Sequence, residues 1–536
     1  MQNRRIYFRK MKILISDNLP DICKTILENA DFQVTTKTDF TPEELKEGIG
    51  KYDGLIIRSS TQCTPEIIEN ASKLRAICRA GVGVDNVDVP AATKKGIIVM
   101  NTPGGNTTST AEHTITLLLA LSRNIPQACN SVREGGWERK KFTGTQVSGK
   151  TLGMIGLGKI GKEVAKRAIA LEMRVLGYDP FVSNETIPKL NVQFVKNLDD
   201  IYKQADYVTL HIPLVNETKN LISSREFALM KDGVRIINCA RGGILSEDAL
   251  YNALVSGKVA GAAIDVFEKE PPEGNKLLAL DNVLPTPHLG ALTEEAQYAV
   301  ARDAAEQMVD ALKDNNIRNA VNMPVQGPEE LQQLKPFIIL TEKMGALLIQ
   351  LVKGRIKSID IQFSGDISKD NIHPLTDSLL AGILKHVLDE DVNIINARIL
   401  ADERGIKINE IISSTTQDYT NLIVARTNTD NGESSVSGTV FRNNEPKIET
   451  INDYRVDMDP IGHVLILFGQ DKPGLIGDIG KMLGDQDVNI GHMTFGRKGT
   501  GGVAMIVINV DAVVSQETLL SIEKMECIDS AYMLKF

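Results

Sequence analysis

The stretch TLGMIGLGKIG, residues 151–161, decides the fold, because it places the spacing G-x-G-x-x-G between a β-like apolar run and a helical run. Its glycines are expected to have three uses. Gly156 permits a tight turn, Gly158 lets the backbone approach a pyrophosphate, and Gly161 lets helix and strand pack closely. The next expected strand ends in Asp179, whose carboxylate can bind both ribose hydroxyls and would repel the 2′-phosphate of NADP. The pattern therefore predicts a NAD-binding Rossmann unit.

An earlier α/β unit precedes this loop. Short β-rich runs alternate there with helical patterns, at residues 12–17, 54–60, 74–80 and 96–103. The rhythm restarts at the glycine loop and continues to residues 261–266. A helical pattern after residues 285–297 runs to about Asn315 and could return to the first unit. The glycine loop comes late because the nucleotide domain is inserted into a domain that begins near the N-terminus.

Three further segments complete this interpretation. Residues 108–126 are amphipathic and predict one helix that ends at Pro126, since proline cannot continue a helix. A Pro/Gly-containing boundary at residues 319–330 leads into mixed α and β patterns. Residues 463–536 show the order β-α-β-β-α-β of ferredoxin-like modules.

The predicted fold class is α/β, with two Rossmann-like doubly wound parallel-sheet domains, then an α+β intervening domain and a ferredoxin-like domain. The ten residues before Met11 are expected to form a ragged start. The predicted bounds are 11–108 with 292–326 for a discontinuous substrate-binding domain, 109–291 for the NAD-binding domain, 327–457 for the intervening domain, and 462–536 for the last domain.

Composition narrows the class of protein. A chain of 536 residues exceeds one core at roughly 150 residues per domain. The formal charge of −9 and the lack of a basic block with aromatics disfavour nucleic acid as a partner. The six cysteines are scattered, which disfavours a disulfide framework and a metal cluster. No stretch reaches 18 apolar residues, so we expect no membrane partner and a cytoplasmic enzyme.

Three charged residues follow expected strands of the nucleotide domain and are candidate catalytic groups. They are Arg241 in NCARGG, Glu270 in DVFEKEPP and His288 in PTPHLGA. Ligands of open α/β sheets bind at the carboxyl ends of the strands, where these residues are expected to meet. An imidazole suits proton transfer near neutral pH. His211, also near a strand end, stays an alternative, and strand-terminal Arg and Glu often form only surface pairs.

Several motifs resemble one known family. GLGKIG with Asp179, NCARGG, DVFEKEPP and PHLGA are similar to successive signatures of the D-isomer-specific 2-hydroxyacid dehydrogenases. Four longer stretches resemble the branch of that family that oxidises 3-phosphoglycerate with NAD to 3-phosphohydroxypyruvate, the first step of L-serine synthesis. These stretches are IIRSST (56–61), RAGVGVDNVD (79–88), NTPGGNTTSTAEH (101–113) and GGWERKKFTGTQVSGKTLG (135–153). The resemblance spans almost the whole chain.

The resemblance implies roles for individual residues. Arg241 would bind the substrate carboxylate and the reacting oxygen, His288 would be the general acid/base, and Glu270 would pair with His288. A guanidinium grips a carboxylate through two parallel bonds, and a nearby carboxylate stabilises a protonated imidazole. The implied substrate-binding residues are Arg58, Ser59, Arg79, Asn106 and Arg241. The implied cofactor-binding residues are Val82, Gly156, Gly158, Lys159, Ile160, Gly161, Asp179, Ile212, Cys239, Ala240, Arg241, Asp265, His288 and Gly290. Close relatives often have threonine at the position that Val82 occupies here.

The C-terminal module resembles an ACT domain, a small amino-acid-binding fold. In relatives two such domains pair and bind serine between them, which implies L-serine as an effector and Asp471 and Asn489 as its contacts. Some relatives carry a histidine where this chain has Gly469. Paired dehydrogenase domains and paired tails imply a homodimer or homotetramer.

Two other functions fit parts of the pattern. One is another D-2-hydroxyacid dehydrogenase, such as a glyoxylate or hydroxypyruvate reductase, which Arg58, Arg79 and the ACT-like tail disfavour. The other is a non-catalytic NAD sensor like the corepressors of the same superfamily, which the set of Arg, Glu and His disfavours.

Overall fold

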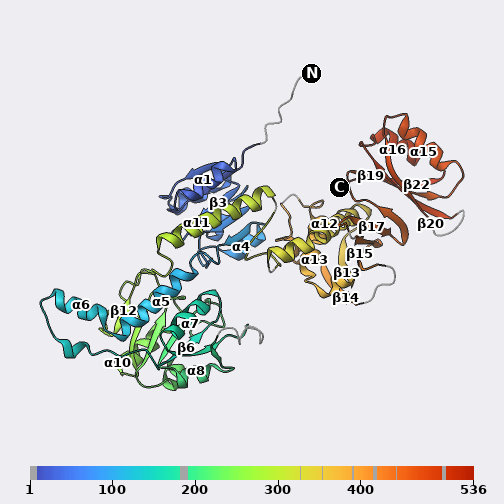
Figure 1. Ribbon diagram of the computed structural model, residues 1–536. Helices are drawn as coiled ribbons and strands as arrows, with labels where there is room; N and C mark the ends of the chain where they lie inside the picture. The colour runs from blue at the N-terminus through green and yellow to red at the C-terminus, as the bar shows by residue number, and fades with distance from the viewer. Residues whose placement is uncertain are drawn as a thin grey trace.

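The computed structural model describes residues 9–181, 191–314, 316–325, 327–352, 354–388, 391–414, 419–441, 443–497 and 502–536. Four sheets form four units in an elongated arrangement, with the two α/β units at one end and the C-terminal unit at the other (Figure 1). Residues 1–8, most of the expected ragged start, lie outside the described residues.

The first unit is a parallel five-stranded sheet in the order β2-β1-β3-β4-β5. Its strands are β1 (Lys12–Ile15), β2 (Gln33–Thr36), β3 (Gly54–Ile57), β4 (Ala76–Arg79) and β5 (Ile98–Asn101). The central strand β3 is buried at every position, as expected where helices cover both faces of a parallel sheet. The helices are α1 (Ile22–Asn29), α2 (Pro42–Gly48), α3 (Pro65–Glu69) and α4 (Val89–Lys94).

A distant helix completes the first unit. Helix α11 (Glu294–Val309) follows the second sheet in the chain but packs against the first one (Figure 1). Its buried Ala304 and Met308 share a hydrophobic cluster with Ile13 and Ile56. Gly54 leaves room for the Met308 sulfur, since a Cβ there would meet Sδ at 2.7 Å. The second sheet therefore lies between two segments of the first unit.

The second unit is a parallel seven-stranded sheet in the order β12-β11-β10-β9-β6-β7-β8. Its strands are β6 (Thr151–Ile155), β7 (Arg174–Tyr178), β8 (Gln193–Phe194), β9 (Tyr207–Leu210), β10 (Val234–Asn238), β11 (Val259–Ile264) and β12 (Val283–Pro285). Its helices are α5 (Thr107–Ser122), α7 (Lys159–Ala170), α8 (Leu198–Gln204), α9 (Ser224–Leu229) and α10 (Glu247–Val255). The strand order reverses between β6 and β9, where doubly wound sheets bind nucleotides. The predicted fold class is confirmed.

One predicted helix boundary is wrong. Helix α5 ends at Ser122, Asn124 has a φ of 51°, and a new helix, α6 (Ile125–Arg133), begins with Pro126 in its first turn. Proline lacks an N–H and has a fixed φ, which suits the first turn of a helix as well as the end of one. Pro126 therefore starts a helix here.

The third unit has one mixed sheet in the order β14-β13-β15-β16-β17-β18. Its strands are β13 (Ile356–Gly365), β14 (Lys407–Ser413), β15 (Asn421–Thr429), β16 (Gly432–Val440), β17 (Pro446–Ile451) and β18 (Tyr454–Met458). Helices α12 (Pro328–Leu351) and α13 (His373–Leu384) pack closely, because a Cβ on Gly345 or Gly382 would overlap a backbone oxygen of the other helix. Helix α14 (Ala397–Glu403) follows α13.

The last unit has the predicted β-α-β-β-α-β order, which is confirmed. Its elements are β19 (His463–Gln470), α15 (Leu475–Gly484), β20 (Ile490–Arg497), β21 (Val503–Val510), α16 (Gln516–Glu523) and β22 (Ile528–Lys535). Strand β19 is buried on both faces: Leu465 and Leu467 belong to the core of this unit, whereas Val464 and Ile466 belong to the core of the third unit. The last two units therefore share a hydrophobic core.

The third unit also contacts the first. Lys94, at the end of α4, lies 2.6 Å from Glu403 of α14, and the Asn393 amide donates to the Gly96 carbonyl at 2.7 Å. The N-terminal end of α4, at Val89, directly follows the loop after β4, which comprises residues 80–88. Among the described residues, no helix has both the length and the apolar character required to cross a membrane.

Candidate active site

The glycine loop connects β6 to α7. Gly156 has a φ of 97°, a conformation that favours glycine, and its N–H donates to the Tyr178 carbonyl at 2.9 Å. A Cβ on Gly156 would overlap the carbonyl oxygen of His211, and one on Gly161 would overlap the carbonyl oxygen of Gly156. A Cβ on Gly158 would meet nothing within 4 Å. Close packing therefore excludes side chains at the outer two glycines, while the backbone at Gly158 is open to a ligand.

Asp179 lies directly beside this loop. Its Oδ2 accepts the Leu157 N–H at 2.8 Å, and its Oδ1 accepts the Phe181 N–H at 2.9 Å. Both bonds fix the carboxylate at the end of β7, next to the N-terminus of α7. A dinucleotide whose pyrophosphate bound that helix terminus would present its adenosine ribose to this charge.

His288 and Glu270 form a hydrogen-bonded pair at the carboxyl ends of β11 and β12. Nδ1 of His288 lies 2.9 Å from Oε2 of Glu270, and Oε1 of Glu270 accepts the Phe267 N–H at 3.1 Å. Burial acts to raise the pKa of Glu270, but the hydrogen bond and charge of His288 outweigh it and hold that pKa below its ordinary value. Glu270 therefore stays ionised and favours a proton on Nδ1 of His288, which leaves Nε2 to react.

Asp265 fixes the backbone turn that carries His288. Its Oδ1 accepts Thr286 Oγ1 at 2.6 Å and the Leu289 N–H at 2.8 Å, and its Oδ2 accepts the Gly290 N–H at 2.9 Å. Nε2 of His113, on α5, lies 3.1 Å from Oδ1. Burial would raise the pKa of Asp265, but these donors hold it below its ordinary value. The ionised carboxylate thus holds the turn in which His288 has a φ of 56°.

Arg241 follows β10 and contacts the first unit across the boundary between the two α/β units, which we call the crevice. Asn238 fixes its backbone by donating to the Arg241 carbonyl at 2.9 Å. The guanidinium donates from Nε to Oδ2 of Asp85 at 3.0 Å and from Nη1 to the Ala240 carbonyl at 2.6 Å. The structure thus links the nucleotide domain to the loop after β4 at this arginine.

Two more guanidinium groups approach from the first unit. Arg79 ends β4, and burial followed by the charge of Arg241 lowers its pKa to about 10, with Arg58 adding to the effect. Arg58 follows β3 and donates to Oε1 of Gln297 on α11. The pKa of Arg58 is also lowered, by burial. The three guanidinium groups form one cationic region at the crevice.

The structure places the other predicted residues around the same crevice with one exception. Asn106 precedes α5 and its buried Oδ1 has no hydrogen-bond partner among the described atoms, whereas Ser59 is exposed beyond β3. Val82 lies in the loop after β4. Ile212 follows β9, and Cys239 and Ala240 follow β10. Lys159 and Ile160 begin α7, and Gly290 ends the His288 turn.

Asp471 and Asn489 are the exception, because they lie in the last unit at opposite ends of its sheet. Gln470, beside Asp471, pairs with Val503, whereas Ile490, beside Asn489, pairs with Val510 at the other end of β21. Asp471 accepts from Arg497 at 3.0 Å, and Asn489 donates to Asp511 at 2.9 Å. One ligand contacting both would need two copies of this unit.

Sequence reasoning missed three residues that contact the site. Asp85 binds Arg241, Gln297 binds Arg58, and His113 binds Asp265. Each lies inside or beside a motif already noted, but its partner is distant in the sequence. Only the folded chain brings these pairs together.

His211, the alternative histidine, does not suit proton transfer. Burial lowers its pKa to about 4, and its Nε2 lies 3.2 Å from Thr209 Oγ1. Its ring therefore stays neutral at physiological pH.

His113, Cys239 and Asp265 lie close enough to hold a metal ion, with ligand atoms within 4.8 Å of one another. However, N–H and O–H donors already occupy both oxygens of Asp265. Burial raises the pKa of the Cys239 thiol to about 12, and metal ligation requires the thiolate. We assign the cluster to holding the His288 turn.

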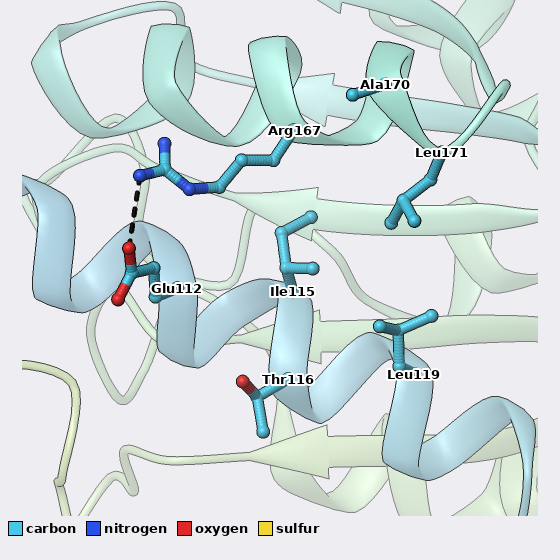
Figure 2. A pocket seen from close by; sticks show the side chains of 7 residues that line it. All are labelled: Glu112, Ile115, Thr116, Leu119, Arg167, Ala170 and Leu171. Carbon is cyan, nitrogen blue, oxygen red and sulfur yellow. Dashed lines mark hydrogen bonds and ion pairs between the residues drawn. The ribbon is translucent and has the colours of Figure 1, made fainter.

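Two hollows flank the nucleotide domain. One, of about 370 Å³, adjoins the His288–Glu270 pair and is otherwise lined mostly by apolar residues, including Phe267, Pro271, Pro272 and Leu278. The other is an open groove of about 480 Å³ between α5 and α7, where Glu112 pairs with Arg167 and Ile115 and Leu119 approach Leu171 (Figure 2). The groove lies at the end of α7 away from the glycine loop, so it is separate from the nucleotide site.

Comparisons with known proteins agree with this architecture. Residues 115–290 match the family model "D-isomer specific 2-hydroxyacid dehydrogenase, NAD binding domain". Residues 333–452 match "D-3-phosphoglycerate dehydrogenase intervening domain", and residues 463–527 match "ACT domain".

Similar proteins match over nearly the whole chain. The D-3-phosphoglycerate dehydrogenase of Archaeoglobus fulgidus is 43% identical over 98% of this chain and 100% of its own length. That of Bacillus subtilis is 40% identical over 93% of this chain and 95% of its own. Among solved structures, a glyoxylate reductase from Paecilomyes thermophila is 28% identical, with a TM-score of 0.55, and covers 59% of this chain and 99% of its own.

The fold and the site define an NAD-dependent oxidoreductase of the D-isomer-specific 2-hydroxyacid dehydrogenase class. Within that class, the chain belongs to the D-3-phosphoglycerate dehydrogenase family.

Asp179 is predicted to set the preference for NAD. Asp179→Ser removes the charge that repels a 2′-phosphate, so we expect the ratio of kcat/KM for NAD over NADP to fall about 100-fold. Steady-state kinetics with both cofactors would measure it. Asp200→Ser, on α8, is the matched control and should leave the ratio unchanged. An unchanged ratio in Asp179→Ser would contradict this role.

Proposed function

We propose that the protein oxidises 3-phosphoglycerate to 3-phosphohydroxypyruvate with NAD, in the first step of L-serine biosynthesis. The names of its relatives support this reaction. The observation that carries the proposal is the group of three arginines, one of which, Arg241, follows β10, the strand that neighbours the one leading to Glu270. A substrate with a carboxylate and a phosphate needs several cations as well as a proton acceptor, here His288.

The arginines would divide the substrate between the two domains. Arg241 would hold the carboxylate and the reacting oxygen, since its neighbour Gly242 packs against the loop that carries Glu270, where a Cβ on Gly242 would overlap the Phe267 carbonyl. Arg58 and Arg79, with Asn106 and Ser59, would hold the phosphate from the other side of the crevice. Fixing both ends of the substrate makes the reaction effectively unimolecular.

His288 would accept the hydroxyl proton at Nε2 during oxidation. Its Nδ1–H donates to Glu270, whose charge stabilises the imidazolium that forms. In the reverse direction the same ring would return the proton to the keto oxygen. When bound, NAD would supply the hydride acceptor, and the residues that would hold it are the glycine loop, Asp179, the ends of β9 and β10, Asp265 and Gly290.

The arginines and the His288–Glu270 pair each weigh against one of the two alternatives. A glyoxylate or hydroxypyruvate reductase acts on a substrate without phosphate and needs fewer cations than this crevice offers. A non-catalytic NAD sensor needs no proton acceptor, yet His288 and Glu270 are hydrogen-bonded and Glu270 is held ionised.

The ACT domain supports a regulated enzyme with L-serine as effector. Asp471 and Asn489 lie at opposite ends of one sheet, so their joint site would form between two chains of a homodimer or homotetramer. Gly469 replaces a histidine of some relatives, and here a Cβ at that position would overlap the Cys527 carbonyl.

Six free cysteines favour a reducing compartment, which supports a cytoplasmic location. The packing of α11 against the first sheet supports a discontinuous substrate-binding domain of residues 11–108 with 292–326.

Removal of the imidazole should abolish most turnover. His288→Ala is expected to lower kcat by about 10²–10⁴-fold, because the hydroxyl proton has no acceptor, while NADH binding changes little. NADH absorbance with 3-phosphohydroxypyruvate measures turnover, and NADH fluorescence measures binding. The exposed His386, replaced by Ala, is the control. Full turnover in His288→Ala, or faster reduction of unphosphorylated hydroxypyruvate by the wild type, would refute the proposal.

The His288–Glu270 pair predicts an effect of the carboxylate charge on turnover. Glu270→Gln keeps an acceptor oxygen for Nδ1 of His288 but removes the negative charge that stabilises the imidazolium formed during oxidation, so kcat should fall about 10-fold or more. NADH absorbance measures this rate. Glu268→Gln removes a charge from the same loop and should keep the wild-type kcat. A kcat of Glu270→Gln equal to that of the wild type would argue against the pair.

Serine sensitivity tests the effector proposal. L-serine is expected to slow the reduction of 3-phosphohydroxypyruvate, and Asn489→Ala should raise the serine concentration for half inhibition at least about 10-fold. Its rate without serine should equal that of the wild type, because Asn489 lies outside the crevice. Equal inhibition of both proteins would exclude Asn489 from the site.

A further inference from the structure

We infer that Asp85 is a positioning residue that orients the guanidinium of Arg241 toward the substrate, and that Gly83 is required because Arg241 passes over it. The inference rests on the proposed role of Arg241 as the carboxylate-binding residue. It concerns two residues for which neither the motifs nor the comparisons gave a role.

The orientation follows from which nitrogens of Arg241 are engaged. Nε donates to Oδ2 of Asp85 at 3.0 Å, and Nη1 donates to the Ala240 carbonyl at 2.6 Å. A planar guanidinium held at these two nitrogens has a fixed orientation. Nη2 then lies over Gly83, where a Cβ would overlap it. Any side chain at Gly83 would therefore displace the guanidinium.

The loop that carries Asp85 is itself tied to the other arginines. Gly81 likewise leaves space for the guanidinium of Arg79, since a Cβ on Gly81 would overlap Nη1 of Arg79. Asn86, next to Asp85, donates to the carbonyl oxygen of Arg58 at 2.8 Å. One short loop thus contacts the guanidinium groups of Arg79 and Arg241 and the backbone of Arg58.

The Asp85–Arg241 ion pair acts by orienting the guanidinium of Arg241 rather than by adding to the stability of the fold. The side chain of Asp85 is 63% exposed, and exposed ion pairs contribute little to stability. Its charge also partly cancels the cationic region that attracts the substrate. If Asp85 acted only through its charge, its removal would make the crevice more positive and strengthen anion binding. If Asp85 orients Arg241, its removal weakens that binding.

Two variants at Asp85 separate these effects. Asp85→Ala is expected to lower kcat/KM for 3-phosphohydroxypyruvate about 10-fold, mainly through KM, without change in the dissociation constant of NADH or in Tm. Asp85→Asn keeps an acceptor oxygen for Nε and should stay within about 3-fold of the wild type. A fall in KM for Asp85→Ala, or equal losses in both variants, would overturn the inference.

Two further variants test the partner. Arg241→Lys has no Nε–H donor at that position, so Asp85→Ala should have no further effect in that background. Gly83→Ala should lower kcat/KM at least about 10-fold. Gly480→Ala on α15, where an added Cβ meets nothing within 4 Å, is the control. Full additivity of Asp85→Ala with Arg241→Lys, or wild-type kinetics of Gly83→Ala, would contradict the contact.

The outcomes also distinguish this inference from the proposed function. If Arg241→Lys keeps the wild-type kcat/KM, the role of Arg241 falls and the inference falls with it. If Arg241→Lys is impaired while Asp85→Ala is not, only the role of Asp85 falls.

Discussion

The active site depends on the buried carboxylate of Asp265. It accepts hydrogen bonds from Thr286, Leu289 and Gly290 and so fixes the turn in which His288 adopts a left-handed backbone conformation. A left-handed φ is costly for a residue with a side chain and persists only where its surroundings enforce it. That turn directs the imidazole toward Glu270, which keeps its charge because His288 outweighs the effect of burial. The orientation of the His288–Glu270 pair is thus set by a neighbouring buried group.

A second constraint is the crowding of like charges. Burial, followed by the charge of Arg241 and with a smaller effect of Arg58, lowers the pKa of Arg79 to about 10. The glycines of the loop after β4 leave space for two of these guanidinium groups, and Asp85 fixes the orientation of one. Repulsion between the arginines opposes this arrangement, and a substrate with two anionic groups would offset it. The positive charge of these arginines and their fixed positions therefore both favour a ligand with two anionic groups.

The third and fourth units are joined to this site through packing rather than through catalytic groups. The ACT domain shares a core with the intervening domain along β19, and the intervening domain contacts the end of α4 through Lys94 and Gly96. Helix α4 begins directly after the loop that carries Asp85. A continuous path of packed elements thus connects the ACT domain to the crevice.

The sequence alone determined the fold class, the order of the domains and the Rossmann unit, because hydrophobic periodicity and glycine spacing are local signals. It also supplied Arg241, Glu270 and His288 as candidates, since each follows a strand. It misplaced the end of α5, because proline fits both the end and the first turn of a helix. Only the tertiary structure decided that His211 is buried and neutral, that Asp471 and Asn489 lie at opposite ends of one sheet, and that Asp85, Gln297 and His113 contact the site. The physical reason is that burial and hydrogen-bond partners arise between residues far apart in the chain, which no local pattern encodes.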